Sequence, residues 1–143
     1  MAVRNSTPRL FESIAVVLWL GLAGCGGDSF SPTVTSVAGT YQATTFTFDG
    51  GSGPTNLLAL RASVTITLAA DGTTTGRMFV PDVLDGGDLD VDLAGTWTLT
   101  GSTVAFVQEA DTFMRDVLFT AEQDRLRARG TFGEEVVVLV LTK

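Results

Sequence analysis

The chain has 143 residues, of which 45% are hydrophobic and 17% charged, enough for one domain with its own core. It contains no histidine and a single cysteine, which excludes Ser-His-Asp and Cys-His catalysis, imidazole metal sites and a disulfide framework. Sixteen acidic residues against nine basic ones give a net charge of −7. This argues against a nucleic-acid partner, because binding the phosphate backbone requires a basic face.

The first 24 residues have the pattern of a secretory signal peptide. Arg4 and Arg9 are basic, the apolar run 14–22 follows, and small residues precede a cysteine. The run has about ten apolar residues, whereas a helix needs roughly 20 to cross a bilayer. A buried N-terminal core helix is the alternative, but the glycines within 24–27 disfavour it. We therefore predict a signal-peptide helix over residues 1–24.

Residues Leu22-Ala-Gly-Cys25 resemble the lipobox of bacterial lipoproteins. The resemblance implies cleavage before Cys25, a diacylglyceryl thioether on its sulfur and a further acyl chain, such as palmitate, on the new terminus. Two or three acyl chains anchor a protein stably, where one binds only marginally. Gly26 stands where an aspartate tends to retain such proteins at the inner membrane. The resemblance thus implies a membrane-anchored lipoprotein of the bacterial cell envelope, on the periplasmic side of the outer membrane.

Residues 25–36 are predicted to be the lipidated cysteine and a flexible tether, since they are rich in glycine, serine and proline. Removal of the leader takes away Arg4, Arg9 and Glu12, so the formal charge falls from −7 to about −8. Anionic headgroups repel such a surface, and we expect the body, residues 37–143, to stand off the membrane.

Residues 37–143 have the sequence pattern of β-strands throughout. Eight segments show period-2 alternation or strong β composition and are separated by turn residues. The predicted strands are 37–48, 57–69, 73–80, 95–100, 103–108, 112–121, 125–132 and 135–142. Asp71-Gly72 indicates a type I′ hairpin turn. A short helix within 111–128 is the alternative to the sixth strand.

Eight sequential strands with short turns indicate a meander, and closing a meander into a barrel removes both sheet edges. The last strand, Val136–Leu141, is apolar on both faces. We predict an all-β fold, an eight-stranded up-and-down antiparallel barrel over residues 37–143. A two-sheet sandwich is the alternative.

Two short motifs support a family resemblance. Gly39-Thr-Tyr41 opens the first predicted strand, and Gly95-Thr-Trp97 opens the fourth. The second motif, with the hairpin that follows it, resembles the Gly-Thr-Trp hairpin of bacterial lipocalin-like domains, and the turn Ala70–Thr73 is also similar. Lipocalins proper carry Gly-x-Trp on the first strand, so this chain is nearer the small lipocalin-like lipoproteins. The resemblance implies a lipocalin-like barrel, and it places Arg129 inside against an aromatic floor.

The candidate ligand-lining residues are mostly aromatic. They are Tyr41, Phe46, Phe79, Trp97, Leu99, Phe106, Arg129 and Phe132. The small residues Ala62, Ala128 and Gly130 would leave room beside them. An eight-stranded barrel is just wide enough for side chains to fill, so a filled core is the alternative to a small apolar cavity.

Other chemistry is scarce. The loop Asp82–Asp92 holds five aspartates at a density that calcium tolerates, but Leu93 and Leu99 stand where a calcium loop needs Gly and Glu. We predict a solvated loop and no metal, and weak calcium binding is the alternative. The alternating arginines at 125, 127 and 129 form either an anion- or partner-docking stripe or an outward strand face paired to acids such as Asp116 and Glu122.

Possible carboxylate pairs for glycoside hydrolysis are Asp111 with Asp116 and Glu134 with Glu135, and both read as surface acids. We therefore predict no catalytic residues and no cofactor. The predicted function is a lipid-anchored, non-enzymatic envelope protein whose barrel binds a small apolar or amphipathic ligand. The alternative is a filled barrel that docks another envelope protein.

Overall fold

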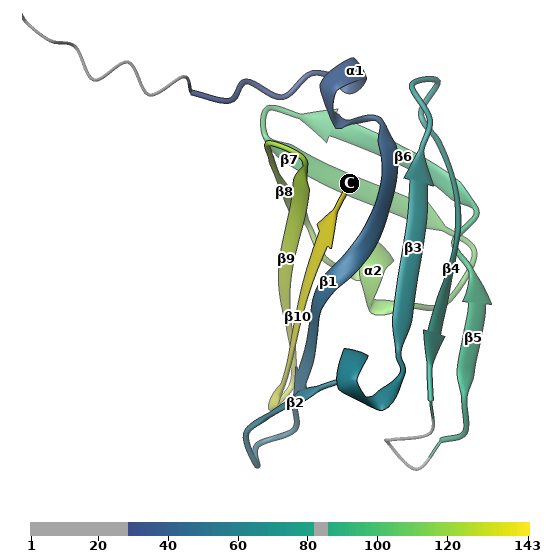
Figure 1. Ribbon diagram of the computed structural model, residues 1–143, viewed down its shortest axis with the longest axis vertical. Helices are drawn as coiled ribbons and strands as arrows, with labels where there is room; N and C mark the ends of the chain where they lie inside the picture. The colour runs from purple at the N-terminus through teal and green to yellow at the C-terminus, as the bar shows by residue number, and fades with distance from the viewer. Residues whose placement is uncertain (1–28, 82–85) are drawn as a thin grey trace, which may run out of the picture.

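The computed structural model describes residues 29–81 and 86–143, which form an almost entirely β structure (Figure 1). The predicted signal peptide, Cys25, Asp82 and Asp85 lie outside the described residues. The helical elements are α1 (Val34–Val37), the 3-10 turn η1 (Leu58–Leu60) and α2 (Phe113–Asp116). The strands are β1 (Gly39–Asp49), β2 (Pro54–Asn56), β3 (Ser63–Leu68), β4 (Thr73–Val80), β5 (Leu89–Asp92), β6 (Gly95–Thr100), β7 (Thr103–Gln108), β8 (Phe119–Glu122), β9 (Arg125–Phe132) and β10 (Glu135–Thr142).

Across the described residues the strands form a closed barrel of eight antiparallel strands, each beside its neighbour in the chain. β5 and β6 act as one barrel strand because they pair with β4 in a single register, with Arg77 opposite Asp92 and Thr74 opposite Gly95. The predicted up-and-down barrel is therefore confirmed. The sandwich alternative is wrong, since β10 also pairs with β1 and makes one continuous sheet.

Closure depends on β1, which uses both of its edges. Against β10 its register runs from Gln42 opposite Thr142 to Asp49 opposite Val136, with a bulge between Ala43 and Thr45. On its other edge β1 pairs first with β3 and then, at its end, with β2. A bulge bends and twists a strand, which allows an eleven-residue strand to follow the curved wall.

Period-2 alternation sorts side chains between the interior and the outer face. On β9, Leu126 and Ala128 are buried while the three arginines are exposed. Phe106 and Phe119 meet edge to face in the core, with ring centroids 5.1 Å apart. Each such large apolar side chain contributes about 1.5–3 kcal/mol of hydrophobic stabilisation when buried.

The wall turns a corner between β5 and β6. The Leu93 carbonyl accepts hydrogen bonds from the buried Thr74 hydroxyl (2.8 Å) and the buried Gln108 amide (3.2 Å). At this corner a Cβ on Gly95 would lie 2.1 Å from the Val107 carbonyl oxygen. A glycine is required there because the neighbouring backbone occupies the space of a side chain.

Several predicted segments have other bounds in the structure. The end of the predicted tether and residue 37 of the first predicted strand form α1, so β1 begins only at Gly39. Residues 57–62 are not strand, because the Asn56 side chain accepts hydrogen bonds from the amides of Leu58 and Ala59 and starts a 3-10 turn. Leu60, which a continuous strand would have placed on the same face as the buried Val64 and Ile66, is 41% exposed. The turn ends at Arg61, whose φ of 74° is left-handed.

The sixth predicted strand is shorter than expected. The helix left open as an alternative is present as α2, whose Met114 is completely buried, and β8 begins only at Phe119. Part of the predicted acidic loop is instead β5, where Asp90 accepts two hydrogen bonds of 2.6 Å from Arg77.

The Asp71-Gly72 turn is a tight hairpin but not type I′. Gly72 has a φ of 88°, whereas Asp71 keeps a negative φ and accepts hydrogen bonds from the Thr73 amide and hydroxyl. The Gly72 amide donates to Ala69, and the Ala69 amide donates to Thr73. This is the three-residue hairpin geometry in which only the last loop residue is left-handed.

Replacement of Gly95 tests the corner. We expect Gly95→Ala to destabilise the protein by about 1–3 kcal/mol or more, because the methyl group meets backbone and not a movable side chain. Chemical denaturation measures the change. Gly86→Ala is the matched control, since a Cβ there meets nothing within 4 Å. Equal stability of the two variants would contradict the close approach at Gly95.

Candidate functional site

An apolar cavity of about 260 Å³ opens at the end of the barrel where β2 lies, called here the β2-end cavity. This is the lower end in Figure 1, opposite α1. Its walls are Phe46, Phe48, Leu57, Met78, Val80, Leu89, Phe113, Phe132, Glu135 and Val137.

The strand period places most of this wall. Phe46 and Phe48 lie two residues apart at the end of β1, and Met78 and Val80 do the same at the end of β4. Val137 faces them from the start of β10. Residues two apart on a strand share a face, so the wall follows from the inward face of three strands.

The other walls come from outside the regular barrel. α2 places Phe113 against Phe46, with ring centroids 5.7 Å apart and the planes tilted by 33°. The loop after β2 is tied down by the Leu57 amide, which donates to the Phe46 carbonyl at 2.8 Å, and Leu57 itself is buried. These two segments narrow the barrel mouth and leave a hollow between them.

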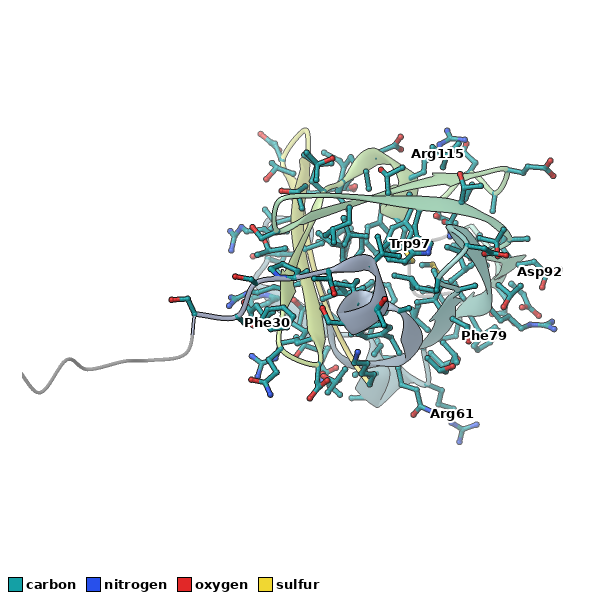
Figure 2. All side chains as sticks on the ribbon, turned by 90° about the horizontal axis from the view of Figure 1, so that it is seen from above. Phe30, Arg61, Phe79, Asp92, Trp97 and Arg115 are labelled. Carbon is teal, nitrogen blue, oxygen red and sulfur yellow. The ribbon has the colours of Figure 1, made fainter. Side chains whose placement is uncertain are left out.

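Glu134 and Glu135 are both exposed, but only Glu135 is in the described wall of the cavity, where it is the charged residue. The guanidinium of Arg115, on the same helix as Phe113, is engaged by Asp111 at 2.5 Å and Asp116 at 3.5 Å. Figure 2 shows the Arg61 and Arg115 side chains at the periphery of the barrel. The local charge at the wall is therefore negative.

The opposite end of the barrel is plugged. Val37 of α1 is buried, and the Tyr41 hydroxyl donates to its carbonyl at 2.6 Å. The C-terminal Lys143 ammonium donates to the carbonyls of Ser36 and Ala38, and it lies 5.7 Å from the Tyr41 ring centroid. The last residue of the chain thus fastens the helix that precedes the first strand.

The buried Tyr41 has an altered acidity. Burial, and secondarily the negative charge of Asp124, raise the pKa of Tyr41 to about 12. Both effects disfavour the tyrosinate. Trp97 also stabilises this end, because its indole N–H donates to the Ala69 carbonyl at 2.8 Å. A shallower hollow of about 330 Å³ beside Trp97 and Leu99 is lined partly by Asp71.

Of the predicted lining residues, Phe46 and Phe132 line the β2-end cavity. Phe106 lies in the packed core. Tyr41, Trp97 and Leu99 lie towards the α1 end, where Leu99 is half-buried. The eight candidates are therefore not brought together in one site.

Phe79 and Arg129 do not face the interior. Phe79 alternates with the buried Met78 and Val80, and Figure 2 shows it at the barrel's periphery. Arg129 is exposed on the outer face of β9, so its predicted inward position is wrong. Successive side chains on a strand point to opposite faces, and this alternation places Phe79 and Arg129 on the outer face whatever their residue type.

Gly130 leaves no free space for a ligand. A Cβ there would lie 2.6 Å from Val117 and 2.8 Å from the Phe132 ring. The space that we expected for a ligand beside Gly130 is thus filled by neighbouring side chains.

Sequence reasoning missed most of the cavity wall: Phe48, Leu57, Met78, Val80, Leu89, Phe113, Glu135 and Val137. Strand parity could have found Phe48, Met78 and Val80. Phe113 and Leu57 depend on a short helix and a loop whose packing no local pattern specifies.

The remaining predicted chemistry is dispersed over the surface. Within residues 29–81 and 86–143 no three acidic side chains are grouped to hold a metal ion. Asp111 and Asp116 share Arg115, and Arg125 is 3.4 Å from Glu122, as the outward-face interpretation of the arginine stripe expected. Asp116 is therefore not the partner of that stripe.

Comparisons with protein-family models, with curated proteins and with solved structures give no match to this chain. In the part of the chain that the structure describes, no helix has the length and hydrophobicity needed to span a membrane.

Tyr41 is the sole tyrosine, which makes its acidity directly measurable. We expect tyrosinate absorbance to rise with a midpoint near pH 12 in the folded protein and near the ordinary value of about 10 after denaturation. Because the folded pKa is the higher one, its contribution to stability is complete below about pH 10 and is lost as pH rises to about 12. A folded midpoint near 10 would contradict the burial of this phenol.

Proposed function

We propose that this protein is a non-enzymatic, lipid-anchored protein of the bacterial cell envelope whose barrel holds a small apolar ligand at its β2 end. The observation that carries the ligand-binding part is the β2-end cavity, a hollow of about 260 Å³ with four phenylalanines in its wall. Small-molecule sites are concave and mostly apolar, with a few polar groups that orient the ligand.

The cavity volume limits the ligand. Sites for drug-sized molecules begin at about 300 Å³, whereas an apolar cavity of about 150 Å³ holds benzene. The β2-end cavity lies between these sizes. It therefore suits one ring or a short alkyl group, and a longer molecule would leave its remainder outside the mouth.

The proposed anchor is compatible with this position. The lipobox-like residues Leu22–Cys25 and the signal-peptide pattern support acylation of Cys25. The described chain enters the barrel through α1, at the end opposite the cavity (Figure 1). A tether attached there leaves the cavity mouth accessible.

A second candidate is docking of an envelope protein on the outer face of β9 and β10. Arg127 and Arg129 are exposed there, opposite Val140 and Val138 of β10. β5, with its exposed aspartates, lies away from this face, because β7 and β8 stand between β9 and the barrel strand that β5 and β6 form. The arginine stripe and the acidic strand therefore do not form one surface.

Filling the cavity tests ligand binding. We expect Val137→Phe to weaken binding of the neutral fluorescent probe N-phenylnaphthylamine by about tenfold or more, since a change of 1.4 kcal/mol has that effect. The matched control is Val138→Phe, whose side chain starts on the outer face of the same strand. Fluorescence titration gives both dissociation constants.

If the wild-type protein binds neither this probe nor the single-ring compound benzyl alcohol, the ligand-binding proposal is overturned and the docking candidate is favoured. Equal binding by both variants would place the probe elsewhere. Denaturation curves of the two variants verify that each is folded.

Replacement of the cysteine tests the anchor. We expect Cys25→Ser to abolish incorporation of labelled palmitate and to move the protein from the membrane fraction to the soluble fraction, because the serine hydroxyl cannot form the thioether. Ser29→Ala is the control. Unchanged labelling of Cys25→Ser would contradict the lipoprotein proposal.

A further inference from the structure

We propose that the ligand of the β2-end cavity is an organic cation with an apolar body, an aryl- or alkylammonium compound. This inference rests on the proposed function and specifies the ligand class. It is carried by two features of the same wall, its aromatic rings and its acidic residue.

The aromatic contribution comes from separate elements. Phe46 and Phe48 belong to β1, Phe113 to α2 and Phe132 to β9, and all four line the cavity. The face of an aromatic ring carries negative charge density, which attracts ammonium groups and favours quaternary ammonium ligands most when water is excluded. The ring centroids of Phe46 and Phe113 are 5.7 Å apart, so the two rings form adjoining parts of the cavity wall.

The acidic contribution comes from Glu135, which lies in the wall at the start of β10. Arg115, on the helix that carries Phe113, forms ion pairs with Asp111 and Asp116, and Arg61 lies at the periphery of the barrel. A ligand carboxylate in the mouth would meet a like charge, whereas an ammonium group would meet an opposite one. The charge of the wall therefore disfavours fatty acids and other apolar anions.

The alternative occupants are less well matched. A neutral apolar molecule would use the phenylalanines but gain nothing from Glu135. In the described wall of the other hollow, beside Trp97, the charged residue is Asp71, and its carboxylate accepts hydrogen bonds from Thr73. Among residues 29–81 and 86–143, four phenylalanine rings and a carboxylate come together in the wall of the β2-end cavity, and not beside Trp97.

The test is calorimetric titration of the full-length protein with three compounds that share a benzyl group. Benzyltrimethylammonium is the cation, benzyl alcohol the neutral analogue and phenylacetate the anion. We expect the cation to bind at least about fivefold more tightly than the alcohol, as an interaction of about 1 kcal/mol between unit charges at 4 Å in water gives. Phenylacetate should bind most weakly, and added salt should reduce these differences.

Two matched pairs of variants locate the effect. Glu135→Gln should remove the preference for the cation. Glu134→Gln removes the same charge from an equally exposed neighbour that does not line the cavity, and it should preserve the preference. Phe113→Leu should weaken cation binding more than alcohol binding, because it removes a ring and keeps an apolar side chain. Phe79→Leu, on the outer face, should change neither.

The outcomes separate the two proposals. Equal binding of the three compounds, or a cation preference that Glu135→Gln leaves intact, would overturn the ligand class while the cavity remains a ligand site. If Glu134→Gln and Glu135→Gln lower the preference for the cation equally, the preference comes from the net charge of the protein and not from the cavity wall. This result would also overturn the proposed ligand class. If neither these compounds nor N-phenylnaphthylamine bind, the proposed function itself fails.

Discussion

The pairing of β1 with β10 is the contact on which the rest of the structure depends. It joins the first and last barrel strands, with Gln42 opposite Thr142 at one end and Asp49 opposite Val136 at the other. Without it, the meander would leave two long free edges, each able to pair with another chain. Closure also brings together side chains that are far apart in the sequence, such as Phe46 and Val137 in the cavity wall. Such non-local pairing is favourable only once most of the other strands are formed.

The same closure makes the two barrel ends different. At the α1 end the chain finishes beside its own entry point, so Lys143 reaches the carbonyls that end α1 and the ring of Tyr41. At the β2 end, β1 leaves β3 after Gln42 and pairs with β2 instead, and the intervening gap is covered by the loop containing Leu57. Covering a gap with a loop and a four-residue helix leaves a hollow where a regular strand would have filled it. The cavity thus results from the irregular segments, a loop and a short helix, that cover the β2 end of the barrel.

The barrel could be predicted from the sequence because strand alternation and turn residues agree along most of the chain. β4, β6, β7, β9 and β10 have the predicted bounds. The turn before β3 was missed because its apolar residues, such as Leu60, continue the alternating pattern although the Asn56 side chain starts a 3-10 turn. α2 was ambiguous because Phe113 and Val117 fit a helical and a strand period equally well.

The candidate site could be predicted only in part. Phe46 and Phe132 follow from composition and parity, whereas Phe79 and Arg129 were selected by residue type or family resemblance and lie on the outer face. Glu135 lies on the same face of β10 as Val137, but β10 is apolar on both faces, so its pattern does not mark which face is inward. Phe113 could not be placed because its position depends on the packing of a short helix. Packing between elements, and not the pattern within one, determines these contacts.

The central claim is that the β2-end cavity holds a small ligand, and native mass spectrometry of the protein purified under non-denaturing conditions from the cells that make it tests this most directly. We expect one small adduct per chain that disappears when the barrel is unfolded. A bare protein mass, unchanged after addition of N-phenylnaphthylamine and the benzyl compounds, would contradict it.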